Sequence, residues 1–345
     1  MTTFNYSKIE KIFDLKITKT GFLKSEQSKK IPTAKKTETG VRSWSLEDLP
    51  FIGEQYGFIQ KSKLKKPKVV TVFSSKGGCF KSSICFTMAR MYALHNLKVL
   101  VIGLDYQMDI SNMLSGGYLN SDNEELSLEE IDKSPQVKGL YDLAMGTTTL
   151  EEIIQPTEIS SLHYIPETAN LNILSEYLSS KNKREYWLNT TVIQKLKPKY
   201  DLIMLDLGPS WSLLTSNALV ATDVLVSPVE TKILHYQNIK NFVTYLENFQ
   251  KQMELDFKTV FIPTKFSPSK KLSTSIRKYY LTNLPTTNVS IRESNQIEEA
   301  NAQYLTVIES SPTSLIASET RELLKELFES YIADETKPSE NKSWH

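Results

Sequence analysis

The sequence predicts an α/β fold in which a doubly wound, mostly parallel sheet follows a small, mostly helical region. The first observation is a series of short aliphatic and β-branched runs at residues 69–73, 99–104, 202–207, 224–228 and 259–263. The second is that longer helical patterns separate these runs, and the third is that a glycine turn follows the first run directly. Strands covered by helices on both faces are apolar along most of their length, as these runs are.

Composition limits the classes of protein that fit. The 345 residues, 40% of them hydrophobic, are enough for about two structural units. The 41 basic and 40 acidic residues nearly cancel, so net charge predicts neither nucleic-acid nor membrane binding. Residues 1–68, however, hold 14 Lys and one Arg against seven acidic residues. Such a basic arm is either a contact for DNA or a protein partner, or a solvated tail.

Cysteine usage and hydropathy indicate the compartment. Cys79 and Cys85 are the only cysteines, too few for a disulfide framework. The sequence has no run of about 18 apolar residues and no apolar stretch typical of a signal peptide near its start. We therefore expect a cytoplasmic protein with no membrane partner.

We expect three parts along the chain: a basic helical region with a linker at 1–68, the main domain at 69–333, and a polar tail at 334–345. In the first part, the lysine-rich segment 25–39 is predicted to be a flexible linker. Ser45 is a predicted helix N-cap, with Asp48 at the capping-box position. A second basic cluster at 61–68 is predicted to link into the main domain, and the acidic stretch 122–132 to be an exposed insertion.

The glycine turn has the order that phosphate binding requires. Gly77 and Gly78 follow the first predicted strand, and Lys81 and Ser82 open the next helix. Glycines let backbone N–H groups point inward, and a helix N-terminus presents unpaired donors. Lys81 supplies a charge for the β and γ phosphates, and Ser82 offers a hydroxyl to Mg²⁺. The turn is therefore predicted to bind a nucleotide.

Two aspartates follow predicted strands at the sheet edge where ligands bind in open α/β folds. Asp105 follows the run at 99–104, where it can orient the water that attacks the γ phosphate; the alternative is a helix-capping aspartate. Asp206 lies in the run 202–207, where it can hold Mg²⁺ with Ser82.

Basic residues gather near the end of the main domain. We expect them to contact DNA phosphates, which would give nonspecific, salt-sensitive binding. The alternative is an ordinary solvated helix face. The residues are Lys265, Lys270, Lys271, Arg277 and Lys278.

The last predicted helix, residues 319–332, is apolar on one side and rich in glutamate on the other. A membrane-targeting helix would carry Lys and Arg on its polar side, so we expect this helix to pack onto the core. Its apolar residues are Leu323, Leu324, Leu327, Phe328 and Tyr331.

The segment Lys76 to Ser82 resembles the deviant Walker motif Lys-Gly-Gly-x-Gly-Lys-Ser/Thr of the ParA and MinD family, and the resemblance spans most of residues 68–331. It implies a P-loop NTPase fold of the SIMIBI kind, with ATP and Mg²⁺ as cofactors. It also implies that Lys76 reaches across a homodimer to the partner's nucleotide, and that Lys76, Lys81 and Asp105 are catalytic. The residues that the resemblance assigns to the nucleotide are Lys76, Gly77, Gly78, Cys79, Phe80, Lys81, Ser82, Ser83, Pro263 and Thr264.

The chain departs from the family pattern in the turn. Phe80 stands where the family usually has glycine, a feature that resembles ParA proteins with an extra N-terminal DNA-binding domain; the alternative is a damaged nucleotide site. Gly103 and Tyr106 replace the usual Asp and Pro around Asp105.

The function that the resemblance implies is that of a nucleoid-associated partition ATPase with weak intrinsic activity. It would dimerise on ATP, bind DNA nonspecifically and hydrolyse ATP when a ParB-like centromere-binding protein stimulates it. The alternative is a nucleotide-responsive, DNA-binding transcriptional regulator with little or no turnover. A MinD-like membrane positioner and iron–sulfur relatives fit less well, because the last helix is acidic and no cysteine lies outside the turn and its helix.

Overall fold

The computed structural model describes residues 3–36, 40–116 and 137–334. The predicted insertion at 122–132 and residues 335–345 of the predicted tail lie outside the described residues.

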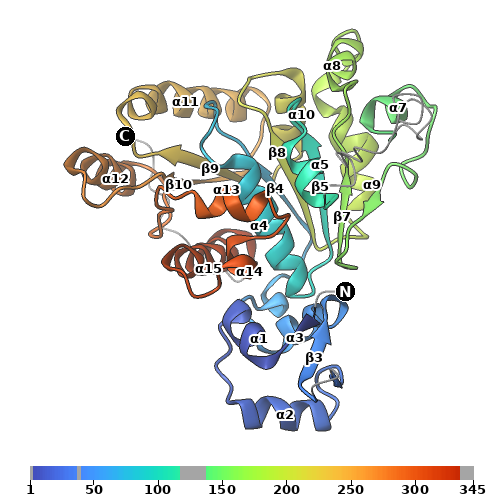
Figure 1. The fold of residues 1–345 in the computed structure, drawn as a ribbon. Coiled ribbons are helices and arrows are strands. Elements are labelled where there is room, and N and C mark those ends of the chain that lie inside the picture. Colours follow the sequence, from blue (N-terminus) through green and yellow to red (C-terminus); the bar gives the residue numbers. More distant parts are fainter. Residues whose placement is uncertain (1–2, 37–39, 117–136, 335–345) are drawn as a thin grey trace, which may run out of the picture.

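Among the described residues, the main domain contains a seven-stranded sheet in the order β10-β9-β4-β8-β5-β7-β6 (Figure 1). Neighbouring strands are parallel except for β6, which pairs antiparallel with β7 at one edge. The strands are β4 (Lys68–Val72), β5 (Val99–Leu104), β6 (Gln155–Pro156), β7 (Leu162–Ile165), β8 (Leu202–Leu207), β9 (Val224–Glu230) and β10 (Lys258–Thr264). The predicted fold class is confirmed, and the five predicted runs are five of these strands.

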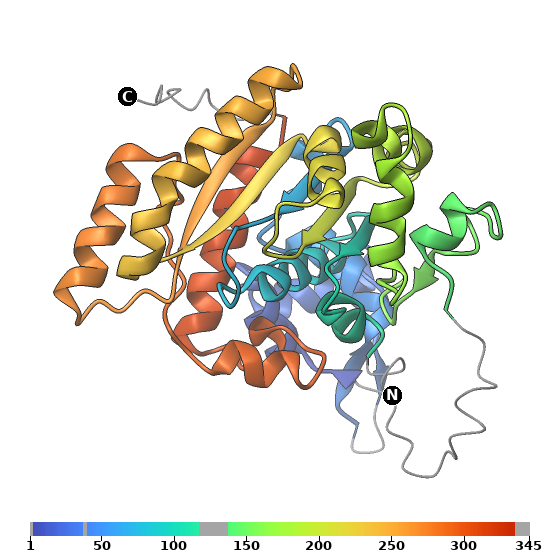
Figure 2. The ribbon, with the colours of Figure 1, turned by 90° about the horizontal axis from the view of Figure 1, so that it is seen from above.

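Helices cover both faces of the sheet (Figure 2). Alternate residues of β4 point to opposite faces: Val70 and Val72 pack with the helices after the glycine turn and at the end of the domain, whereas Val69 packs with the helices on the other side. The helices are α4 (Lys81–Leu94), α5 (Asp109–Leu114), α7 (Leu140–Ala144), α8 (Leu171–Ser179), α9 (Gln194–Leu196), α10 (Leu213–Ala221), α11 (Ile233–Gln252), α12 (Lys271–Asn283), α13 (Gln296–Asn301), α14 (Val307–Ser310) and α15 (Leu315–Leu327).

The N-terminal unit, residues 3–66, combines helices with a small antiparallel sheet in the order β1-β3-β2. The sheet was not predicted, because two of its strands have only two residues each. The predicted N-cap is confirmed: the backbone N–H of Ser45 donates to Asp48 Oδ2 at 2.8 Å, as in a capping box. The elements are β1 (Thr3–Phe4), α1 (Tyr6–Phe13), α2 (Lys19–Gln27), β2 (Lys35–Lys36), β3 (Arg42–Ser45) and α3 (Leu49–Tyr56).

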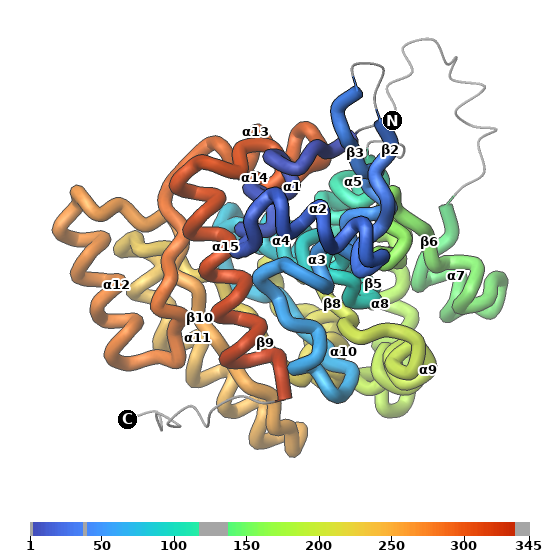
Figure 3. The backbone as a smooth tube through the Cα atoms, turned by 90° about the horizontal axis from the view of Figure 1, so that it is seen from below, coloured from blue at the N-terminus to red at the C-terminus, as the bar shows by residue number. Residues whose placement is uncertain are grey.

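This unit is packed against the main domain (Figure 3). Helix α3 approaches α4 so closely that a Cβ on Gly53 would lie 2.0 Å from the carbonyl oxygen of Leu94. The predicted linker at 61–68 is also held in place: Lys63 Nζ lies 2.8 Å from Glu329, and the Lys65 backbone N–H donates to Asp334 at 2.6 Å. One hydrophobic cluster therefore continues from the N-terminal unit into the main domain.

The prediction of a flexible linker at 25–39 is wrong for the part that the structure describes. Residues 25–27 end helix α2, and the buried carboxylate of Glu26 accepts a hydrogen bond from the Ala34 backbone N–H at 2.9 Å and pairs with Arg42. Lys29 and Lys30 are exposed, as their composition implied. The composition correctly indicated contact with solvent, but a buried charge that has to be paired fixes the backbone.

The last helix packs onto the core as predicted. Leu323, Leu324, Leu327 and Phe328 are buried, and the Tyr92 hydroxyl of α4 donates to the Leu324 carbonyl at 3.1 Å. None of the helices in the described part of the chain is long and apolar enough to cross a membrane.

Candidate functional site

The glycine turn joins β4 to α4 at the carboxyl edge of the sheet. Gly77 and Gly78 are exposed, no atom lies within 4 Å of the position that a Cβ on Gly77 would take, and Gly78 has a φ of +72°. A positive φ is easy for glycine and costly for most other residues. The backbone N–H groups of this turn and of the first turn of α4 can therefore be approached by an anion without obstruction from side chains.

Lys81 points back into this turn. Its side chain is 7% exposed, and Nζ donates to the carbonyl oxygen of Lys76 at 3.0 Å. A phosphate group would offer the ammonium a charged acceptor in place of this carbonyl. Lys81 therefore lies beside the glycine turn, and its contact with phosphate stays a prediction.

Asp206 is a buried carboxylate without a hydrogen-bond donor. It lies in β8, in register with Val72 of β4 and Gly103 of β5. Its side chain is fully buried, and neither carboxylate oxygen has a hydrogen-bond partner among the described residues. Burial raises the pKa of Asp206 to about 7. The nearby Ser82 hydroxyl lowers this pKa in part, although its geometry is not that of a hydrogen bond.

Such an orphaned carboxylate next to a hydroxyl fits a hard divalent cation, which prefers oxygen ligands. Mg²⁺ in nucleotide sites is typically held through one or two protein oxygens together with phosphates and water. Asp206 and Ser82 would be those two groups here.

Asp105 lies just past β5, beside the turn. Its Oδ1 accepts the Gln107 backbone N–H at 3.3 Å, while α5 begins at Asp109 with no side-chain cap from Asp105. The helix-capping alternative is therefore not observed. Gly208, which follows β8, lies against Asp105, because a Cβ there would be 2.8 Å from Asp105 Oδ1.

Lys76, the residue expected to reach a partner subunit, is held within its own chain. Its Nζ lies 2.5 Å from Glu230 Oε2, and Lys265 Nζ lies 3.1 Å from the other oxygen of the same carboxylate. Burial raises the pKa of Glu230, but the hydrogen bonds from the two lysines outweigh it, and the net pKa is lowered. Glu230 therefore stays ionised between two ammonium groups.

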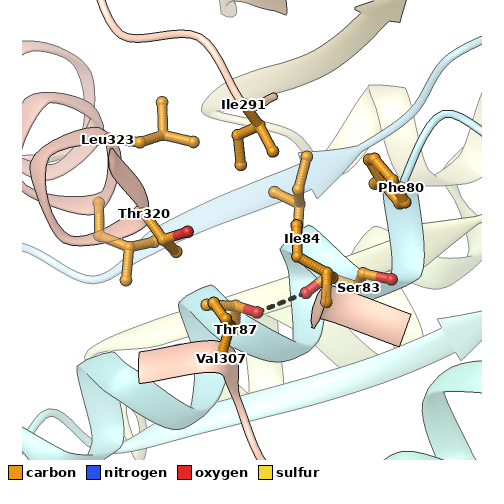
Figure 4. A pocket seen from close by; sticks show the side chains of 10 residues that line it. Phe80, Ser83, Ile84, Thr87, Ile291, Val307, Thr320 and Leu323 are labelled. Atoms are coloured by element: carbon orange, nitrogen blue, oxygen red, sulfur yellow. Dashed lines mark hydrogen bonds between the residues drawn. The ribbon is translucent and has the colours of Figure 1, made fainter. Parts of the chain in front are cut away.

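The Phe80 ring lies beside Ile84 at the start of α4, at one end of an apolar cavity (Figure 4). Its backbone φ is +70°, a region that disfavours bulky residues. The ring is 9% exposed and shares an apolar cavity with Ile84 of α4, Ile291 and Leu323 of α15. The side chain therefore anchors the turn to the helices at the end of the domain, and the glycine backbone stays open.

Two hollows flank Lys76 on the exposed side. One is lined by Trp211, Leu234 and Tyr245, and the other by Lys265 and Leu272 among others. Three apolar side chains that line these hollows are exposed, Leu234 at 63%, Tyr245 at 47% and Leu272 at 53%.

Some residues that the sequence assigned to one site lie apart in the structure. Pro263 and Thr264 are buried at the end of β10, so their place in an adenine pocket stays a prediction. Lys265 lies before helix α12 and close to the glycine turn, with its Nζ 5.2 Å from the centre of the Phe80 ring.

The basic residues of α12 and its N-cap, Lys270, differ in their contacts with the rest of the protein. Lys271 and Lys278 are exposed, and Lys270 Nζ lies 3.8 Å from Glu293. Arg277 instead donates to the Ser290 hydroxyl at 2.6 Å, which ties its guanidinium to the fold.

Sequence reasoning missed Glu230 and Glu167, two acids at the same sheet edge. Glu230 ends β9, and its position at the carboxyl end of a predicted strand was a usable signal. Glu167 follows β7, a four-residue strand that was not predicted.

Comparisons with known proteins indicate the family of the chain. The family described as "AAA domain" matches residues 67–259, more than half of the chain. The chain is 24% identical over 204 residues to the chromosome partitioning protein ParA of Myxococcus xanthus, covering 59% of this chain and 66% of that protein.

Among solved structures, an ATP complex of a McdA variant from Cyanothece has a TM-score of 0.63 at 18% identity, covering 76% of this chain and 96% of that chain. Cobyrinic acid a,c-diamide synthase from Mycobacterium smegmatis, with an ATP analogue and magnesium, has a TM-score of 0.60 at 20% identity, covering 76% and 94%. These structural likenesses concern the fold. With the sequence match and the lysine-flanked glycine turn, the chain belongs to the AAA-domain family of P-loop ATPases that includes the ParA partition proteins.

Proposed function

We propose that this protein is a DNA partition ATPase that dimerises on ATP, binds DNA without sequence preference and hydrolyses ATP when a centromere-binding partner stimulates it. The observation that carries the proposal is the open glycine turn with Lys81 beside it and the orphaned carboxylate of Asp206 behind it. ATP and Mg²⁺ match these groups: the turn and Lys81 take the triphosphate, and Ser82 and Asp206 take the cation. Asp105 would orient the attacking water.

The dimer is supported by the surroundings of Lys76. ATP would bring negative charge next to the Lys76–Glu230–Lys265 cluster, and Glu230 would then compete with phosphate for both lysines. Release of Lys76 from Glu230 frees it to meet a second nucleotide across an interface. The exposed Leu234 and the hollows that flank Lys76 give that interface an apolar part.

The test is steady-state phosphate release with Mg·ATP, together with light scattering for the size of the particle. Lys81→Ala is expected to lose nucleotide binding and dimerisation, and Asp105→Ala to keep both but lose turnover. Lys98→Ala is the matched control, because Lys98 is an exposed lysine that follows α4, away from the turn. ATP-dependent dimerisation that survives in Lys81→Ala would refute the proposal.

A second candidate, a nucleotide-responsive transcriptional regulator, is favoured by the N-terminal unit. Helices α1 and α2 are joined by residues 14–18 and followed by the hairpin of β2 and β3, and helix-turn-helix units place their second helix in the major groove. Exposed lysines gather on α2 and the segments around it. They are Lys16, Lys19, Lys24, Lys29, Lys30, Lys35 and Lys36.

DNA binding separates the two candidates. The partition ATPase is expected to bind any duplex with ATP, and to turn over faster with DNA and its partner. A regulator would bind one operator through α2 and show no turnover. A mobility-shift series with Lys19→Ala and Lys24→Ala on random and promoter-derived duplexes measures this difference.

A further inference from the structure

A second carboxylate lies directly beside Asp105. Glu167 follows β7, and its side chain is 4% exposed. It has no partner of opposite charge among its hydrogen bonds, which join it to the segment that carries Asp105.

Glu167 holds both ends of the connection from β5 to α5. Its Oε1 accepts the Asp105 backbone N–H at 3.2 Å. Its Oε2 accepts from Ser111 twice, from the backbone N–H at 3.2 Å and from the hydroxyl at 3.0 Å. The Ser111 hydroxyl oxygen accepts the Glu167 backbone N–H at 2.8 Å in return. One side chain therefore fixes the start of this connection and the first turn of α5.

A glycine makes room for this carboxylate. A Cβ on Gly103 would lie 2.3 Å from Glu167 Cγ and 2.7 Å from its Oε1, which no real Cβ tolerates. Gly103 is in register with Asp206 on the neighbouring parallel strand, so these two residues face the same side of the sheet. Any side chain at position 103 would push the Glu167 carboxylate away from Asp105.

We propose that Glu167 is the residue that positions Asp105 for ATP hydrolysis, in a space that exists because residue 103 is glycine. This inference rests on the proposed ATPase function. Asp105 is enclosed between Glu167, which holds its backbone, and Gly208, which limits its carboxylate from the other side. Hydrolysis requires the water-orienting group to be placed within a fraction of an ångström, whereas nucleotide binding by the turn does not depend on it.

The first test is Glu167→Ala, assayed for kcat and KM with Mg·ATP. Loss of positioning is expected to lower kcat about 10- to 100-fold with little change in KM. Glu167→Gln keeps an acceptor for the Asp105 N–H and is expected to retain most of the turnover. Leu162→Ala is the control for instability alone, because it truncates a buried residue at the start of β7, the strand whose other end leads to Glu167. It is expected to lower Tm and keep kcat.

A second test removes the carboxylate at position 167 and introduces one at position 103 of β5. Because Glu167 Cδ lies 2.4 Å from the position of a Cβ on residue 103, the carboxylate introduced by Gly103→Asp in the Glu167→Ala background would occupy nearly the same place. The double variant is expected to recover most of the kcat that Glu167→Ala loses. Gly103→Asp alone, which crowds two carboxylates together, is expected to be worse than the double variant.

Three outcomes would count against the inference. Wild-type kcat in Glu167→Ala would show that Asp105 needs no support. A double variant that folds as well as Glu167→Ala but recovers no turnover would show that the carboxylate is structural only. No hydrolysis by the wild-type chain, with DNA and partner present, would remove the proposed ATPase function and this inference with it.

Discussion

Phe80 offers a quantitative test of how the nucleotide turn is held. The residue combines an unfavourable backbone with a favourable side chain: its φ is +70°, and its ring is 9% exposed in an apolar cavity. Truncation of a buried Phe to Ala costs about 3–5 kcal/mol, and a β-carbon at left-handed backbone angles costs about 1–2 kcal/mol relative to glycine.

Phe80→Ala is therefore expected to destabilise the protein by about 3–5 kcal/mol, because it loses the ring and keeps the strained β-carbon. Phe80→Gly loses the ring but relieves the strain, so it should be the more stable of the two by about 1 kcal/mol. This order is the reverse of the usual one, in which glycine within a helix is about 1 kcal/mol less stable than alanine.

The assay is thermal unfolding without nucleotide, with the free energy of unfolding from a denaturant titration as a second measurement. The matched control is Lys240, an exposed residue within α11, where Lys240→Gly should be less stable than Lys240→Ala. If Phe80→Ala were as stable as Phe80→Gly, the backbone strain would be negligible. If Phe80→Gly were as stable as the wild type, the ring would not anchor the turn.

Three further predictions follow from buried and exposed groups elsewhere. Burial lowers the pKa of His95 from 6.5 to about 4 in the folded protein. As pH falls, this histidine is therefore protonated in the unfolded chain before it is protonated in the folded protein. Its contribution to the loss of folding stability between pH 6.5 and pH 4 should be about 3 kcal/mol. Denaturant titrations should show a loss that is smaller by about 3 kcal/mol in His95→Gln, which keeps the loss due to His235, whose pKa burial also lowers to about 4. Equal losses in the wild type and the variant would refute this cause. Gly53→Ala should destabilise the protein by more than about 2 kcal/mol, since its Cβ would lie 2.0 Å from the Leu94 carbonyl, whereas Gly77→Ala should leave Tm unchanged. Lys271→Ala and Lys278→Ala should each lower the dependence of log K for DNA on log salt by about one unit, with Tm unchanged. An unchanged slope would remove α12 from the DNA contact.

Local sequence patterns predicted an element correctly where all the residues that define it lie within one short segment. The β-branched runs predicted five strands because a strand buried on both faces is apolar at nearly every position. The capping box at Ser45 was correct because its two partners lie three residues apart. Strands β6 and β7 were missed because they are too short for periodicity to register, and the helical segment 25–27 because lysine content reports exposure rather than order.

The candidate site was also predicted only in part from the sequence. The turn at 76–83, Asp105 and Asp206 could be named from the sequence, because each follows or ends a predicted strand and parallel strands bring their carboxyl ends to one edge. The sequence did not show which side chains of the site contact one another. Glu230 lies between Lys76 and Lys265, and Glu167 holds Asp105, through contacts between segments more than 30 residues apart.

The sequence by itself thus determined that the chain is an α/β protein with a glycine turn typical of phosphate binding and two acids at the edge of its sheet, because local periodicity and glycine chemistry are readable along one strand and one turn. Only the tertiary structure decided that Phe80 supports the turn instead of obstructing it, that Lys76 is neutralised by Glu230, and that Gly103 accommodates Glu167. Those outcomes depend on which side chains share a volume, and that is set by the packing of distant segments against one another.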